Sequence, residues 1–189
     1  HINPAFTIGH AVSGLFPWEN VLYYIVAQLL GAMFGQLVVV ATHRPYYLQT
    51  ENPNNILGTF STISSLDKGT PESRKAATIN GFVNEFAGSF VLFFGALALT
   101  KHFFGAEVAS LAQRAATEQG GIFDASSTAA KLALSQAHAP GLGVAHLALG
   151  FLVMALVTSL GGPTGPGLNP ARDLGPRLVH AFLPKSVLG

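Results

Sequence analysis

The chain has 189 residues, of which 49% are hydrophobic and only 10% are Asp, Glu, Lys or Arg, whereas about 25% of an ordinary soluble domain is charged. Ten basic and nine acidic residues leave a formal charge of +1, which offers no electrostatic excess for binding nucleic acid. The lack of cysteine excludes disulfides, thiolate metal ligands and a cysteine nucleophile. The length predicts one domain over residues 1–189, and because the chain starts at His1 with no signal peptide, we expect it to be truncated at both ends.

The first predicted element is a short helix over Ala5–Leu15. Asn3 is a favourable N-cap, and Pro4 suits the first helical position, where its missing N–H has no helical partner to lose. Gly14 and Pro17 are expected to end this helix near Leu15. At 1.5 Å per residue this helix covers roughly 16 to 18 Å, about half the thickness of a bilayer.

Long apolar runs predict three membrane spans. The first, Asn20–Thr42, has no charged residue across 23 positions, and the second, Ala76–Thr100, has Glu85 as its only charge. The third lies in the 40 uncharged residues between Lys131 and Arg172 and is centred on 146–157. Each run is long enough to cross a hydrocarbon core of about 30 Å.

The stretches between the spans have loop-like composition. Pro45–Lys75 is rich in amide, hydroxyl and charged side chains, which predicts a long loop outside the bilayer. The second loop, 102–143, contains two segments of helix-forming composition, 108–116 and 128–134, where we expect short surface helices. Counted with the residue just before each loop, the first loop has four basic residues and the second has three, a difference that does not orient the chain by the positive-inside rule. These residues are Arg44, Lys68, Arg74 and Lys75 for the first loop and Lys101, Arg114 and Lys131 for the second.

An internal repeat is the most informative feature of the sequence. Ile2–Gly9 matches Leu168–Gly175 at an offset of 166 residues, and the second copy predicts a short helix over Ala171–Phe182. Two short apolar helices in corresponding positions indicate a site near the bilayer midplane. Non-helical backbone can lie at that depth only where it is buried in protein or lines a polar cavity.

The repeated segments carry two Asn-Pro-Ala boxes, and the second continues into Arg172 and Asp173. Together they resemble the aquaporin, or major intrinsic protein, family, and the Asp after the Arg resembles its glycerol facilitator branch. The resemblance implies an all-α, aquaporin-like helical bundle in the plasma membrane, with two re-entrant half-helices meeting at the boxes. It also implies a homotetramer of six-span protomers, so this chain would lack the first, most of the second and the last span. Loop 45–75 would be extracellular and loop 102–143 cytoplasmic.

The resemblance also implies a pore. Asn3 and Asn169 would donate hydrogen bonds to a solute, Arg172 would be the filter arginine, and backbone carbonyls at the entry to each box would be acceptors. These carbonyls belong to His1, Ile2, Pro166, Gly167 and Leu168. Two helix N-termini, each carrying about half a unit of positive charge, would repel cations between them. Taken singly, an Asn-Pro pair is also an ordinary surface cap, and an arginine can snorkel to the interface.

Two filter positions depart from the pattern of glycerol channels. Pro166 stands where such channels often have an aromatic residue, and Val157 stands where water-only members have His and glycerol channels Gly. These residues argue against a water-only filter. Glycerol, water and other small polar solutes, such as undissociated lactic acid, therefore remain open as substrates.

Glu85 and Asp173 are expected to support structure. The resemblance implies that Glu85 accepts backbone N–H groups of a re-entrant loop, and Asp173 is expected to form a local cap or ion pair. The histidines show no metal-ligand spacing with carboxylates, so neither a metal nor a cofactor is expected. The predicted function is a passive channel for small neutral solutes. The alternative, a secondary active transporter with inverted repeats, would call for more carboxylates near the midplane, and no nucleophile, base and orienting group come together to suggest a membrane enzyme.

Overall fold

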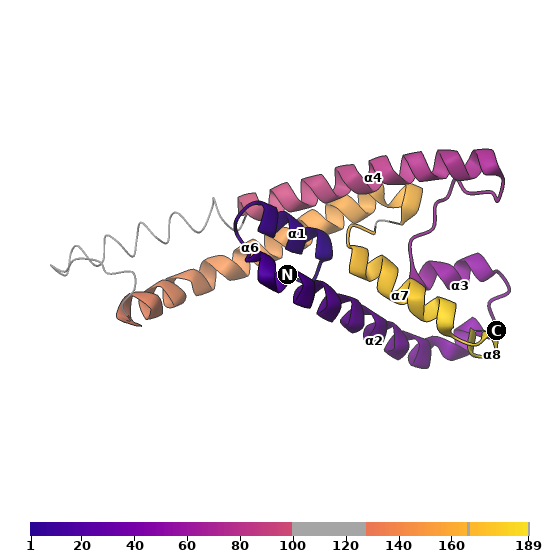
Figure 1. Ribbon diagram of the computed structural model, residues 1–189, viewed down its shortest axis with the longest axis horizontal. Coiled ribbons are helices and arrows are strands. Elements are labelled where there is room, and N and C mark those ends of the chain that lie inside the picture. The colour runs from indigo at the N-terminus through magenta and orange to yellow at the C-terminus, as the bar shows by residue number, and fades with distance from the viewer. Residues whose placement is uncertain (100–127, 166, 189) are drawn as a thin grey trace. The chain divides into compact units, whose positions relative to one another are not determined.

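The computed structural model describes residues 1–99, 128–165 and 167–188. Every regular element in these ranges is helical, which confirms the all-α prediction (Figure 1). In chain order the elements are α1 (Pro4–Val12), η1 (Trp18–Asn20), α2 (Val21–Tyr47), α3 (Pro53–Phe60), α4 (Pro71–Leu97), α6 (Thr128–Thr164), α7 (Pro170–Phe182) and α8 (Lys185–Leu188).

The chain divides into two compact units. The first comprises His1–Phe90 with Val157–Gly189 and contains both Asn-Pro-Ala boxes. The second, Val91–Leu156, contains the end of α4 and most of α6. Within the second unit these helices approach closely, because a Cβ added at Gly95 would clash with Leu152 Cδ2.

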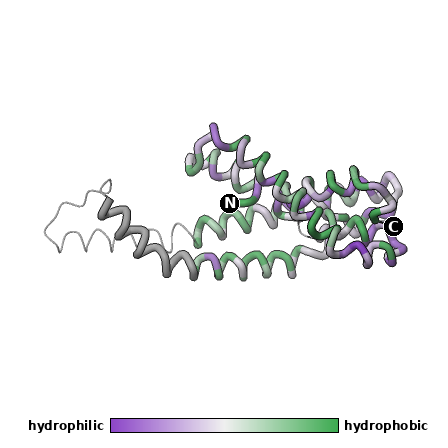
Figure 2. Tube along the Cα trace, turned by 90° about the horizontal axis from the view of Figure 1, so that it is seen from below, coloured by the Kyte–Doolittle hydropathy of each residue, from purple (hydrophilic) through white to green (hydrophobic). Residues whose placement is uncertain are grey.

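Within the part of the chain that the structure describes, three helices are long and apolar enough to cross a membrane, as predicted. Their candidate spans are Trp18–Tyr47, Pro71–Leu97 and Val144–Thr164, and hydrophobic colour predominates along these helices in Figure 2. No more than 17% of the most apolar window of any span is buried. Leu22, Phe34 and Phe151 are each more than half exposed, so these outer faces are suited to lipid or to other membrane helices rather than to water.

Helix ends differ from the prediction in ways that local chemistry explains. α1 stops at Val12 rather than Leu15, because Gly14 adopts a φ of +69° and the chain turns there. α2 continues through Pro45 to Tyr47, where the missing N–H costs only one bond of the last turn. α6 already begins at Thr128, so residues 128–143 of the predicted loop are helical. The rest of that loop, with its predicted helix 108–116, lies outside the described residues.

The predicted outer loop contains a helix that the sequence analysis missed. α3 begins after Asn52, whose side chain accepts a hydrogen bond from Asn54 N at 2.9 Å, and Pro53 occupies the first helical position. This is the same Asn-Pro signal that was interpreted at the two boxes. It went unused at this position because the surrounding residues are polar.

A small hydrophobic core holds α2, α3, α7 and α8 together. It consists of Val40, Tyr47, Ile56, Phe60, Val179 and Leu188, and burying side chains of this size contributes roughly 1.5 to 3 kcal/mol each. Nearer the start of α7, a Cβ added at Gly175 would lie 2.9 Å from Ala32 Cβ and 3.1 Å from Leu29 O. α7 therefore lies against the backbone of α2 (Figure 1), which fixes the half-helix that carries the second box.

Candidate functional site

Both boxes begin their helices with an asparagine cap. Asn3 Oδ1 accepts a hydrogen bond from Ala5 N at 2.9 Å, and Asn169 Oδ1 accepts from Ala171 N at 3.0 Å. Both asparagines have extended backbone, and a proline follows each at the first helical position. The capping prediction from the repeat is confirmed at both positions.

The same two side chains join the boxes to each other. Asn3 Nδ2 donates to Leu168 O at 2.8 Å, and Asn169 Nδ2 donates to Ile2 O at 3.0 Å. Each amide therefore caps its own helix through its oxygen. Through its nitrogen it binds a backbone carbonyl in the segment that leads into the other box. The N-termini of α1 and α7 are thereby held together, and each Nδ2 carries a second proton beyond this contact.

A cavity of about 730 Å³ lies beside the joined boxes. Its lining includes His1, Ile2, Gln28, Thr59, Asn169 and Arg172. Arg172 also borders a second cavity of about 460 Å³, which is lined by amide and hydroxyl side chains, among them Asn54, Asn55, Thr59 and Thr62. A guanidinium that borders two cavities can present its fixed N–H donors to a small molecule in either of them.

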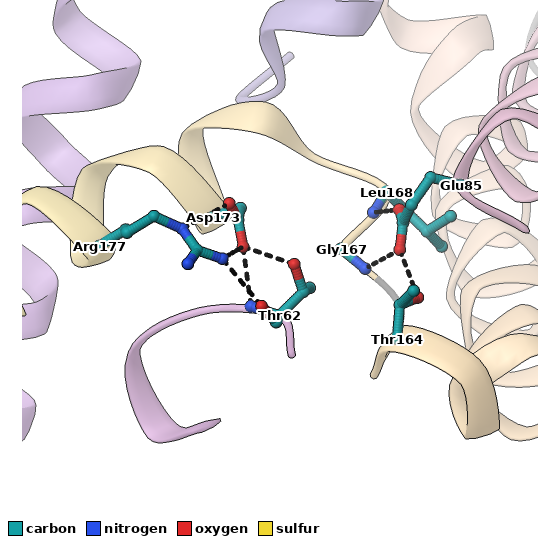
Figure 3. Close-up of polar contacts among 7 residues, drawn as sticks. All are labelled: Thr62, Glu85, Thr164, Gly167, Leu168, Asp173 and Arg177. Carbon is teal, nitrogen blue, oxygen red and sulfur yellow. Dashed lines mark hydrogen bonds and ion pairs between the residues drawn. The ribbon is translucent and has the colours of Figure 1, made fainter. Parts of the chain in front are cut away.

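Glu85 of α4 holds the backbone that enters the second box. Its carboxylate accepts hydrogen bonds from Gly167 N at 2.9 Å, Leu168 N at 2.7 Å and Thr164 Oγ1 at 2.7 Å (Figure 3). Leu168 has a φ of +48°, a conformation that costs an L residue about 1 to 2 kcal/mol. The charge-assisted bonds offset that cost, and they also explain how a lone carboxylate is tolerated inside a membrane span.

Asp173 joins α7 to the segment that follows α3. Its Oδ1 accepts from Thr62 N at 2.7 Å and from Thr62 Oγ1 at 2.6 Å, and Arg177 pairs with the same carboxylate (Figure 3). The predicted ion pair is therefore present, with Arg177 Nη2 3.1 Å from Asp173 Oδ1. The contact with Thr62, 111 positions away, has no signal in the local sequence.

The remaining predicted site residues differ in whether they line a cavity. His1 lines the larger cavity, and its carbonyl accepts from Gln28 Nε2 at 3.1 Å. Val157 lies on α6 with 44% of its surface exposed and lines neither of the cavities that Arg172 borders. Pro166 lies outside the described residues.

Gln28 is the clearest residue that the sequence analysis left without a role. Besides His1 O, its Nε2 donates to Thr7 Oγ1 at 3.0 Å, and Thr7 Oγ1 donates to Asn3 O at 3.1 Å. Gln28 thus supports the first box from α2, as Glu85 supports the second from α4. Gln28 is one of three amides in the uncharged run 20–42, with Asn20 and Gln36. The run therefore gave a weaker signal than the lone carboxylate at position 85 gave in the second span.

Comparisons with known proteins bear on this arrangement. The chain matches the family model described as major intrinsic protein over residues 1–115 and 120–185. It is 59% identical to the glycerol facilitator-aquaporin gla of Lactococcus lactis subsp. cremoris and 60% identical to that of Lactococcus lactis subsp. lactis, over all 189 residues. It is 39% identical over 184 residues to the glycerol uptake facilitator protein-like 5 of Lactiplantibacillus plantarum. The chain spans 65% of the length of the first two relatives and 57% of the third.

Proposed function

Because the chain belongs to the major intrinsic protein family, we propose that it forms the pore of a passive membrane channel for small neutral solutes, with glycerol and water as its first substrates. The resemblance inferred from the two boxes is confirmed by this membership. The names of the relatives, glycerol facilitator-aquaporin and glycerol uptake facilitator, support facilitated passage over ion-coupled transport. We assign no catalytic residue and no cofactor.

The observation that carries the proposal is the reciprocal pair of hydrogen bonds between the boxes, in which Asn3 donates to Leu168 O and Asn169 donates to Ile2 O. It holds the N-termini of two helices together, and each N-terminus carries about half a unit of positive charge. A cation arriving there meets two positive ends, whereas a hydroxyl oxygen meets amide donors. The site therefore favours neutral hydrogen-bonding solutes and disfavours protons and metal ions.

Arg172 is proposed as the filter group. It borders both cavities, and it combines several donors with a fixed positive charge. The carbonyl groups of His1, Ile2, Gly167 and Leu168 are proposed as acceptors, so that a polyol finds donors and acceptors together. Val157 and Pro166 would complete the filter with apolar surface, which extends the proposed solutes to small undissociated acids such as lactic acid.

The protein is a multi-pass membrane protein, given its family and its three candidate spans. We propose that it assembles as a homotetramer with one pore per protomer in the plasma membrane. Lipid and neighbouring protomers would then cover the exposed apolar faces of the long helices. Crosslinking of the intact protein in native membranes tests this assembly, and a largest crosslinked species of two subunits would contradict it.

The channel is tested with the intact protein in proteoliposomes, by stopped-flow light scattering under glycerol and sorbitol gradients. We expect glycerol and water permeability above that of empty vesicles, unchanged by a proton or sodium gradient. Glycerol accumulation driven by either ion gradient would instead establish the transporter.

The matched variants are Asn169→Asp and Asn80→Asp. In Asn169→Asp the carboxylate still caps Ala171 N, but the donor to Ile2 O is lost. Asn80 is exposed on α4 and lines neither cavity. We expect the first variant alone to reduce glycerol flux. Equal glycerol flux in both variants would contradict a solute-binding role for Asn169.

A further inference from the structure

The first turn of α7 carries two neighbouring charged residues with different partners. Arg172 borders the two cavities, whereas Asp173 binds the segment that follows α3. Successive residues of an α-helix point about 100° apart, so one rigid turn fixes both directions at once. Any movement of the segment relative to Asp173 is therefore also a movement relative to Arg172.

Asp173 and Arg177 hold this segment at both backbone groups of one residue. Thr62 N and Thr62 Oγ1 both donate to Asp173 Oδ1, and Arg177 Nη2 donates to Thr62 O at 2.8 Å. Arg177 Nε closes the set by donating to Asp173 Oδ2 at 3.2 Å. Every bond in the set involves an ionised group, and such bonds are about twice as strong as neutral ones. We call these three residues the Thr62 clamp (Figure 3).

The end of α3 and the clamped segment after it together form a wall of the cavity that Arg172 borders. Thr59 and Thr62 both line the cavity of about 460 Å³ that Arg172 borders, and Thr59 also lines the larger cavity. Beyond the clamp the next described anchor is Ser65, whose N donates to Pro163 O at 2.9 Å. Thr59 itself is attached to α2, since its Oγ1 lies 3.0 Å from Tyr47 Oη. The clamp is the hydrogen-bonded attachment of the wall to α7, the helix that carries Arg172.

We propose that Thr62, Asp173 and Arg177 are positioning residues that fix this wall relative to Arg172 and so set the largest polyol that passes. The role rests on the proposed channel function. None of the three needs to touch the solute. When the clamp is weakened, the wall moves away from α7, and a four-carbon polyol gains passage relative to three-carbon glycerol.

The experiment measures erythritol and glycerol permeability on the same vesicles and uses their ratio. This ratio is independent of how many channels fold and insert, so a purely structural defect leaves it unchanged. Thr62→Val removes one clamp donor at nearly constant volume, Thr62→Ser restores the hydroxyl, and Thr78→Val is the matched control. The Thr78 hydroxyl is exposed on α4 and binds only Arg74 O of its own helix.

We expect Thr62→Val to raise the erythritol-to-glycerol ratio by about threefold to tenfold. This is less than the roughly tenfold to hundredfold that a whole hydrogen bond to a charged group represents, because Thr62 N still donates to Asp173 Oδ1. Thr62→Ser and Thr78→Val should both keep the wild-type ratio. An unchanged ratio in a glycerol-conducting Thr62→Val protein overturns the positioning role. A wild-type protein without glycerol flux overturns the channel function itself, so the two failures are distinct.

A double-variant cycle with Asp173→Asn tests whether the contact itself is responsible. Asp173→Asn weakens the acceptor for Thr62 and the pair with Arg177. If the clamp sets the ratio, Thr62→Val should have little further effect in the Asp173→Asn background, because residues that act through one contact are not additive. Full additivity would overturn the proposal even if each single variant changed the ratio.

Discussion

The two Asn-Pro-Ala boxes start their helices alike and are supported by opposite chemistry. At the second box a carboxylate, Glu85, accepts from backbone N–H groups of Gly167 and Leu168. At the first box an amide, Gln28, donates to the backbone carbonyl of His1. The repeat thus preserves the cap and the contact between the boxes, while the surrounding helices stabilise different backbone groups on the two sides.

The boxes also differ in the two residues after the alanine. These are Arg172 and Asp173 in the second box, and Phe6 and Thr7 at the corresponding positions of the first. Only the second half-helix therefore presents a guanidinium to the cavities and a carboxylate to a neighbouring loop. The two boxes therefore share a backbone arrangement but differ in their supporting side chains and in the residues that follow the alanine. A variant at one box can be tested against the matching variant at the other.

The largest expected difference is between the two supporting side chains. Glu85→Ala leaves two backbone N–H groups and the Thr164 hydroxyl without their acceptor, so we expect the free energy of unfolding to fall by about 3 to 5 kcal/mol. Gln28→Ala removes bonds to His1 O and Thr7 Oγ1 and should cost about 1 to 2 kcal/mol. Thermal unfolding of the purified protein in detergent measures both. Equal losses would mean that the boxes are supported equally.

The second prediction concerns the packing of α7 on α2. Gly175→Ala puts a methyl group against Leu29 O and Ala32 Cβ, and such overpacking typically costs about 1 to 3 kcal/mol. Gly31→Ala is the matched control, since a Cβ there meets nothing within 4 Å. The control should be neutral or slightly stabilising because Ala is the better helix former. Identical melting temperatures for the two variants would contradict the close approach.

The third prediction compares Arg172→Val with Phe6→Val. Removing the guanidinium deletes hydrogen bonds worth about 1.5 to 3 kcal/mol to a solute, but the wider opening partly offsets this for neutral molecules. We expect glycerol flux to change by less than about tenfold, while proton or cation leak rises. Phe6→Val should leave the leak unchanged. A dye assay of proton leak in the same vesicles decides between them, and equal leak in both variants would remove Arg172 from the filter.

The smallest effect is expected at Val157. If this residue lines the constriction, Val157→His fills space that a polyol needs and adds a donor suited to water, so the glycerol-to-water permeability ratio should fall by about tenfold or less. Val157→Ile adds bulk without a donor and serves as the control. A ratio that stays at the wild-type value would place Val157 outside the filter.

Much of the fold was predictable because its signals are local. The charge-free run from Asn20 to Thr42 identified α2, and the Asn-Pro pairs identified the starts of α1 and α7. α3 carries the same pair at Asn52 and was missed only because its surroundings are polar. The helical state of 128–143 was missed in part: the composition predicted a short helix there but gave no sign that it continues into the third span.

The sequence by itself determined the caps, the spans and the family, because each depends on residues within a few positions or on a motif that repeats. Only the tertiary structure decided which groups those motifs bind. Asn3 Nδ2 meets Leu168 O across 165 positions, and Thr62 meets Asp173 across 111. A polar side chain inside a membrane protein must find a partner, but its sequence does not say which one. That choice follows from how α2, α4 and α7 bring their backbone groups within hydrogen-bonding distance.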